Sequence, residues 1–134
     1  PLAIGGMNTL KKVYDYEPIP KELPSENSKY ILGAQANLWT EYITTNEGVE
    51  YMILPRMLAL AEVVWSPATS KDWSSFNQRL KWHFRGFQQK GLRYSEGSNK
   101  ITITPRIENE QLSVALSSEI LGCDIYYTLD GSDP

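Results

Sequence analysis

The chain has 134 residues, 41% hydrophobic and 22% charged, which is enough for one domain with a hydrophobic core. A net charge of −3 with scattered basic residues excludes an electrostatic case for nucleic acid or an anionic membrane as partner. Cys123 is the only cysteine, so no internal disulfide can form, and with the lone His83 it offers no zinc-type cluster. We therefore predict neither a metal nor another cofactor. No apolar run approaches the roughly 20 residues that span a bilayer, so no membrane span is predicted.

The first 28 residues are rich in proline, glycine and tyrosine. One short helix is expected over Asn8–Tyr16, with Asn8 or Thr9 near its N-cap. The three prolines between residues 18 and 24 exclude regular structure there, which predicts a long loop.

Residues Ile31 to Leu38 form a short, mostly apolar run that predicts a strand buried on both faces. Side chains alternate along extended chain, so Trp39 and Glu41 at its end are expected to point the same way. An indole face can cover the apolar face of a sugar ring while a carboxylate accepts hydrogen bonds from its hydroxyls. The alternative is that Trp39 belongs to the core and Glu41 to a solvated strand end. On spacing alone this alternative is favoured.

Two amphipathic helices are predicted next. The first carries an apolar stripe from Val49 to Val64 and should end before Ser66. Pro55 either kinks this helix or marks where it begins, because proline is tolerated in a first turn. The second helix should be capped near Ser70 or Asp72 and stop at Gly91. Its buried face is expected to hold Trp73, Phe76, Leu80, Phe84 and Phe87.

No pattern of acids or nucleophiles marks a catalytic centre. Glu62 lies in an apolar segment and is expected to be a paired structural carboxylate. His83 is expected to pack or to cap a helix, since no second ligand or nucleophile accompanies it. The remaining candidates are expected to be solvated loop acids: Asp15, Glu17, Asp130 and Asp133.

From Ser95 the hydrophobic period changes to two. A linker-like break near residues 95–100 precedes three predicted strands, which are centred on Ile103, Val114 and Tyr127. Turn residues separate them, including Asn109-Glu110. Three strands cannot close a stable sandwich, so the segment 95–134 is expected to be the start of a longer β domain.

Three blocks together resemble the C-terminal end of the catalytic domain of family 20 glycoside hydrolases, the β-N-acetylhexosaminidases. They are Tyr14-Asp15-Tyr16-Glu17-Pro18, the block from Ile31 to Tyr42 (ILGAQANLWTEY), and the block from Pro55 to Ser66 (PRMLALAEVVWS). The resemblance covers roughly residues 1–94. Because three separate blocks occur in the right order, it is more specific than the Trp39–Glu41 pair alone. The segment Tyr126–Pro134 resembles, more weakly, the C-terminal β domain of chitobiases and β-hexosaminidases.

The resemblance implies an α/β fold, in which residues 1–94 are the C-terminal portion of a (β/α)8 TIM barrel. The Ile31 strand would be the eighth, and the helices would lie outside it. Residues 95–134 would contribute the first strands of a β-sandwich domain. Active sites of such barrels lie at the C-terminal ends of the strands. By carry-over from the family, Trp39 forms part of the aromatic wall around a terminal N-acetylhexosamine. Glu41 likewise accepts hydrogen bonds from the 4- and 6-hydroxyls of that sugar.

The family's reaction is retaining and substrate-assisted, because the sugar's own 2-acetamido oxygen attacks the anomeric carbon. An adjacent Asp-Glu pair orients that group and protonates the leaving oxygen. No Asp-Glu dipeptide occurs in this chain. Both ends also look cut, since the chain starts at Pro1 without Met and stops after a strand-and-turn pattern. The expectation is a fragment that carries sugar-pocket residues but no catalytic residue, with the rest of the parent chain as its partner.

The resemblance therefore implies part of an exo-acting bacterial β-N-acetylhexosaminidase that acts on glycans or chitooligosaccharides. It also implies export to the periplasm, the cell surface or the medium. Two alternatives stay open: a non-catalytic carbohydrate-binding or protein-interaction module that uses its aromatic residues, and a structural helical domain with Trp39 in its core. The order of the barrel-like blocks before the β segment disfavours the module.

Overall fold

The computed structural model describes residues 8–97, 101–108, 110–119 and 123–133. The chain divides into two compact units, Pro1–Glu96 and Gly97–Pro134, and each is described by itself. The linker residues 98–100 and the turn residue Asn109 lie outside the described ranges. Whether the two units correspond to a barrel segment and a β-sandwich domain stays a prediction.

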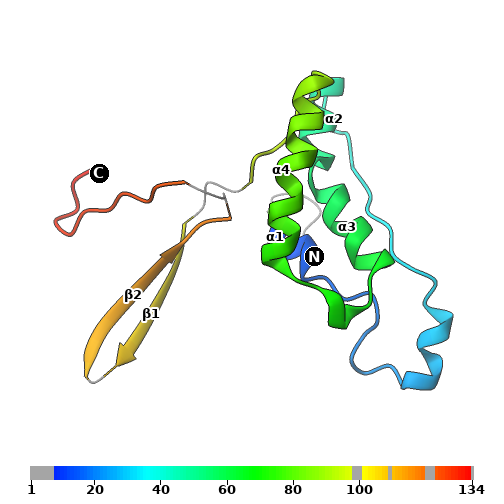
Figure 1. Cartoon of the computed structure of the whole chain (residues 1–134), viewed down its shortest axis with the longest axis horizontal. Helices are drawn as coiled ribbons and strands as arrows, with labels where there is room; N and C mark the ends of the chain where they lie inside the picture. Colours follow the sequence, from blue (N-terminus) through cyan, green and yellow to red (C-terminus); the bar gives the residue numbers. More distant parts are fainter. Residues whose placement is uncertain (1–7, 98–100, 109, 120–122, 134) are drawn as a thin grey trace. The chain divides into compact units, whose positions relative to one another are not determined.

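The described residues of the first unit contain four α-helices, which Figure 1 labels. They are α1 (Leu10–Tyr14), α2 (Asn46–Ile53), α3 (Arg56–Trp65) and α4 (Trp73–Gln89). Two short 3-10 helices, η1 (Ser25–Tyr30) and η2 (Ala68–Ser70), lie in the connections. No helix in the described part of the chain is both long and apolar enough to cross a membrane.

Side-chain caps begin three of these helices, and the sequence predicts two of them, at Thr9 and Asp72. The Oγ1 of Thr9 accepts from the backbone N–H of Lys12 at the start of α1. Thr45 Oγ1 does the same for Gly48 in α2, and an Asp72 carboxylate oxygen for Ser75 in α4. Each cap satisfies a backbone donor that the first turn of a helix leaves unpaired.

The predicted stops are also confirmed. Helix α3 ends at Trp65, with Ser66 as its C-cap. Gly91 follows α4 in the left-handed region, with φ of 65°. Its N–H donates to the carbonyl of Gln88, and the N–H of Leu92 donates to that of Phe87, the hydrogen-bond pattern that closes many helix ends.

Pro55 divides the apolar stripe into two helices rather than kinking one. Helix α2 ends at Ile53, and Pro55 is the N-cap of α3. The second of the two sequence interpretations is therefore confirmed. Pro55 is fully buried. The guanidinium of Arg56 in α3 donates to the carbonyl of Met52 in α2, so a side-chain hydrogen bond joins the two helices.

The core lies where α1, α3 and α4 meet. Its buried members are Leu10, Tyr14, Ala59, Phe76 and Leu80. The predicted inner face of α4 is confirmed for four of its five residues, because Phe76 and Leu80 are buried and Trp73 and Phe84 pack against them. Phe87 is only partly buried and lies outside this core. The rings of Trp73, Tyr14 and Phe76 form a cluster with centroids 4.8 to 5.7 Å apart; Trp73 and Phe76 are stacked, and Tyr14 is tilted against both. Burial of these aromatic rings contributes to the stability of this unit.

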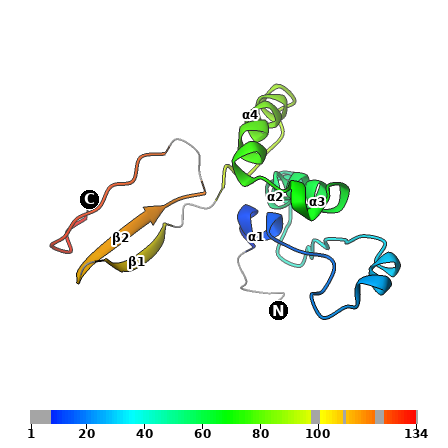
Figure 2. The same ribbon diagram turned by 60° about the horizontal axis from the view of Figure 1, so that its bottom comes forward.

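The strand predicted over Ile31 to Leu38 does not form. These residues are extended but belong to no sheet, and the loop from α1 to α2 runs outside the helices in both views (Figures 1 and 2). Leu32 is 98% exposed. A strand requires a hydrogen-bonded neighbour, and the first unit offers none in its described part. The expectation of a strand buried on both faces is therefore wrong for this structure.

The second unit contains a two-stranded antiparallel hairpin, β1 (Thr102–Glu108) and β2 (Gln111–Ser117). Two of the three predicted strands are thus confirmed. The third is wrong, because residues 123–133 carry no strand in the described part of the chain. The register pairs Ile103 with Leu116 and Ile107 with Leu112, which places apolar side chains on one face.

Many large apolar side chains are exposed in both units. The most exposed include Leu32, Trp65, Ile107 and Leu129. Exposed apolar surface of this kind is typical of faces that are buried against other protein. We expect the 134-residue chain, produced alone, to aggregate or form oligomers. Multi-angle light scattering checks this, and a stable monomer across a hundredfold range of concentration (~1 to 100 μM) would contradict it.

Candidate functional site

A tight turn, Thr40–Ile43, lies between the extended segment and α2. It contains Glu41 and directly follows Trp39, so we call residues 39–43 the Trp39–Glu41 turn. The N–H of Ile43 donates to the carbonyl of Thr40 at 3.0 Å, so Glu41 and Tyr42 are the central residues of a tight turn. Trp39 is 65% exposed, and Glu41 is exposed as well. The alternative that places Trp39 in the core of this chain is therefore wrong. Both side chains are open to a ligand.

Neither of the two predicted site residues is held by other side chains. Among the described residues, the Glu41 carboxylate has no hydrogen bond or ion pair, and Trp39 has no ring contact. Whether both side chains point to one sugar stays a prediction. A free carboxylate beside an exposed indole still provides the two kinds of surface that a sugar ring requires.

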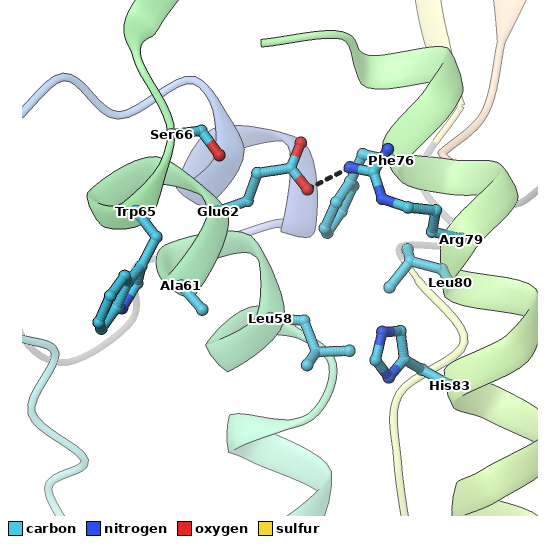
Figure 3. Close-up of a pocket in the computed structure, with 9 residues that line it drawn as sticks. All are labelled: Leu58, Ala61, Glu62, Trp65, Ser66, Phe76, Arg79, Leu80 and His83. Carbon is cyan, nitrogen blue, oxygen red and sulfur yellow. Dashed lines mark hydrogen bonds and ion pairs between the residues drawn. The ribbon is translucent and has the colours of Figure 1, made fainter. Parts of the chain in front are cut away.

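A separate hollow of about 280 Å³ lies between α3 and α4. Figure 3 shows Leu58 and His83 facing each other across it, while Trp65 points away to the far side of α3. Neither Trp39 nor Glu41 lines this hollow. The hollow is therefore not the predicted sugar site.

One end of the hollow holds a polar cluster that joins three helices. The hydroxyl of Tyr14 in α1 donates to Oε1 of Glu62 in α3 at 3.0 Å. The guanidinium of Arg79 in α4 forms an ion pair with Oε2 of the same carboxylate (Figure 3). Glu62 is thus the paired structural carboxylate that the sequence predicts. Each of its two oxygens has a protein partner, which supports a structural role for Glu62.

Burial and the neighbouring carboxylate perturb the titration of this cluster. Desolvation raises the pKa of Tyr14 above its usual value of 10, and the hydrogen bond to Glu62 and its negative charge raise it further. The hydrogen bond to Glu62 likewise raises the pKa of Arg79, so this guanidinium stays charged. Both shifts favour the hydrogen-bonded states that hold the helices together.

The raised pKa of Tyr14 predicts a loss of stability in alkali. In the unfolded chain the phenol ionises near pH 10, whereas in the folded chain its raised pKa moves the ionisation to a higher pH. The stabilisation is therefore complete below pH 10 and is lost as the pH rises through the folded-state pKa. Urea unfolding of the wild type and Tyr14→Phe at pH 8 and about 11 checks this. A loss of stability equal in both proteins would contradict it.

The other acids and the histidine take the roles expected of them. Asp15, Glu17, Asp130 and Asp133 are all exposed. Hydrogen bonds from the side chain and backbone of Ser132 lower the pKa of Asp130, which fits an acid in a solvated turn. His83 is exposed, and its ring contacts that of Phe87. In the described part of the chain, no three His, Cys, Asp or Glu side chains gather where they could hold a metal ion.

These features accompany a clear family match. The family described as "Glycosyl hydrolase family 20, catalytic domain" matches residues 1–68, a range that contains Trp39, Glu41 and Glu62. The chain belongs to glycosyl hydrolase family 20. The catalytic domain of this family is a TIM barrel, so the resemblance found in the sequence and the α/β fold class are confirmed at the level of the family.

Similar proteins carry names that agree with this family. The chain is 52% identical over 80 residues to the "Beta-hexosaminidase" of Porphyromonas gingivalis, an alignment that covers 60% of the chain and 10% of that protein. It is 33% identical over 85 residues to the "Beta-N-acetylhexosaminidase" of Cellulomonas fimi, covering 63% and 17% respectively. It is 32% identical over 74 residues to the "N,N'-diacetylchitobiase" of Vibrio harveyi, covering 55% and 7%. The chain thus spans less than a fifth of each of these relatives.

Sequence reasoning missed the partners of Glu62 and the support of the Trp39–Glu41 turn. Tyr14 and Arg79 lie 48 and 17 residues from Glu62, so no local spacing connects them. One signal was available for Tyr14: a tyrosine on the apolar face of a helix usually has a hydrogen-bond partner when it is buried. No pattern in the sequence predicts that Ile43 packs against Gly48.

Proposed function

We propose that this chain is the C-terminal part of the catalytic domain of an exo-acting β-N-acetylhexosaminidase. The complete enzyme would release terminal non-reducing N-acetylglucosamine or N-acetylgalactosamine from glycans or chitooligosaccharides. The observation that carries this proposal is the family 20 match over residues 1–68, which includes the exposed Trp39–Glu41 turn. The names of the similar proteins support it.

In this proposal Trp39 and Glu41 hold the terminal sugar. The indole provides a flat apolar surface for the C–H face of the ring, and the carboxylate accepts hydrogen bonds from the 4- and 6-hydroxyls. Hydrogen bonds to a charged acceptor are stronger than those to a neutral one. The free state of the Glu41 carboxylate supports this role, because no described protein donor competes with the sugar.

The proposal also assigns a barrel role to the extended segment. Residues Ile31 to Leu38 would form the eighth strand once hydrogen-bonded neighbours are present, which would place the Trp39–Glu41 turn at the C-terminal end of that strand. The extended conformation and the exposed Leu32 support this assignment. Residues 95–134 would then begin a β-sandwich domain. The apolar face of the β1–β2 hairpin supports a second layer there.

The chemical step would be retaining and substrate-assisted, with the 2-acetamido oxygen as nucleophile. The Asp-Glu pair that orients this group and protonates the leaving oxygen would lie upstream of Pro1, since the chain has no such dipeptide. The rest of the parent chain is then a necessary partner. Export to the periplasm, cell surface or medium is proposed from the family resemblance alone.

The test is an assay of aryl β-N-acetylhexosaminides with two proteins: the 134-residue chain and the complete protein that contains it. The proposal predicts release of N-acetylhexosamine by the complete protein and no turnover by the chain alone. The matching aryl β-glucoside is the control, because it lacks the acetamido nucleophile. Sugar binding without release by the complete protein would overturn the enzyme and favour a carbohydrate-binding module.

A further inference from the structure

One side chain of the Trp39–Glu41 turn is not directed to solvent. Ile43, the last residue of this turn, is half-buried, whereas Trp39, Glu41 and Tyr42 are exposed. The turn closes on Ile43, because its N–H donates to the carbonyl of Thr40. The position of Ile43 therefore fixes one end of the turn that carries Glu41.

Ile43 packs against the first turn of α2 at a glycine. A Cβ built on Gly48 would lie 3.0 Å from Cγ2 of Ile43 and 3.4 Å from Oγ1 of Thr45. Thr45 Oγ1 is already held, since it caps α2 by accepting from the N–H of Gly48 at 3.1 Å. The missing side chain at Gly48 is what permits this close approach. Glycine is otherwise unfavourable in a helix, so its presence here calls for such a reason.

We propose that the Ile43–Gly48 contact positions the sugar-holding turn on α2, with Ile43 and Gly48 as positioning residues for the proposed enzyme. This inference rests on the proposed role of Glu41. The cap at Thr45 fixes the start of α2, and the side chain of Ile43 packs against Gly48 in its first turn. The hydrogen bond from Ile43 to Thr40 closes the turn, so the position of Ile43 determines where Glu41 lies. Precise placement is required because binding groups that are displaced by a fraction of an ångström lose much of their effect.

The test is Gly48→Ala in the complete enzyme, assayed with an aryl N-acetyl-β-glucosaminide. The added methyl group must push Ile43 away, which displaces the turn, so kcat/KM should fall by about threefold to tenfold. Helix propensity works in the opposite direction, because alanine favours the helix over glycine. A fall in kcat/KM without a fall in melting temperature therefore separates positioning from general destabilisation.

Gly86→Ala in α4 is the matched control. A Cβ at Gly86 would meet nothing within 4 Å, so this variant makes the same chemical change without a collision. It should keep the kcat/KM of the wild type. Ile43→Ala removes the atom that Gly48→Ala collides with, so it should lower kcat/KM by itself. In the Ile43→Ala background, Gly48→Ala should then lower kcat/KM by less than about a further twofold.

The Glu41→Gln background distinguishes the possible failures. If Glu41→Gln itself leaves kcat/KM unchanged, the proposed role of Glu41 fails. If Glu41→Gln lowers kcat/KM but Gly48→Ala does not, the positioning inference alone is overturned. If Gly48→Ala lowers kcat/KM by the same factor in the Glu41→Gln background as in the wild type, its effect does not depend on Glu41. The positioning inference is then also overturned. We expect Gly48→Ala to lower kcat/KM by less than about twofold in the Glu41→Gln background.

Discussion

Replacing Glu41 with glutamine should lower kcat/KM of the complete enzyme for aryl N-acetyl-β-glucosaminides by about tenfold to a hundredfold. The change preserves the shape of the side chain but removes its charge and replaces one acceptor oxygen by an NH2 donor. Because Glu41 is exposed and makes no interaction with the described residues, the fold should not change. The measurement is steady-state kinetics, accompanied by a circular dichroism spectrum.

Glu47→Gln is the control for this prediction. Glu47 is also exposed and lies six residues farther along, in the first turn of α2, so the same substitution is made on a nearby surface. It should leave kcat/KM within about twofold of the wild type. Equal kinetics for Glu41→Gln and the wild type would remove Glu41 from the sugar pocket.

Replacing Glu62 with alanine should destabilise the first unit by about 2 to 3 kcal/mol. The substitution leaves the hydroxyl of Tyr14 without its acceptor in a site where Tyr14 is only 2% exposed. It also removes the ion pair with Arg79, although half of the Arg79 side chain is exposed and water screens much of that interaction. Urea unfolding of the 134-residue chain measures the change, at a concentration where light scattering shows the same oligomeric state for the wild type and the variant.

Two further variants separate the contributions at Glu62. Glu62→Gln keeps an oxygen acceptor for Tyr14 and should recover more than half of the lost stability. Asp15→Asn breaks the exposed i,i+4 ion pair with Lys11 and should cost less than about 0.5 kcal/mol. If Glu62→Ala were no more harmful than Asp15→Asn, the cluster of Tyr14, Glu62 and Arg79 would not be a structural link.

The helices could be predicted from the sequence because their signals are local. Thr9 and Asp72 cap the N-termini that the pattern assigns to them, and Gly91 adopts the left-handed conformation expected past a helix end. The apolar spacing from Trp73 to Phe84 likewise identified the buried face of α4. Pro55 was ambiguous, because a proline can either kink a helix or begin one.

The strands could be predicted only where the partner was close in sequence. Only two residues separate β1 from β2 in the sequence, and each strand provides the hydrogen-bonding edge of the other. The segments centred on Ala34 and Tyr127 have equally apolar or alternating patterns but no partner strand in the described chain. A period-two pattern specifies which face a strand would bury. It does not specify which other segment of the protein pairs with that strand.

For the candidate site, the sequence indicated residue types but not their geometry, and the role of these residues stays a prediction. Trp39 and Glu41 were selected by their blocks of resemblance, and the family match covers both. Their support by Ile43 and Gly48 depends on a close packing contact that spacing does not encode. Likewise, Glu62 could be predicted to be paired, while its partners Tyr14 and Arg79 follow only from the packing of α1 and α4.

A crystal structure of the complete protein with N-acetylglucosamine bound tests the proposed sugar site most directly. We expect the indole of Trp39 to lie against the sugar ring. We also expect a carboxylate oxygen of Glu41 to lie within about 2.5 to 3.0 Å of the 4- or 6-hydroxyl. A sugar bound in a pocket that excludes both side chains would contradict the proposed site.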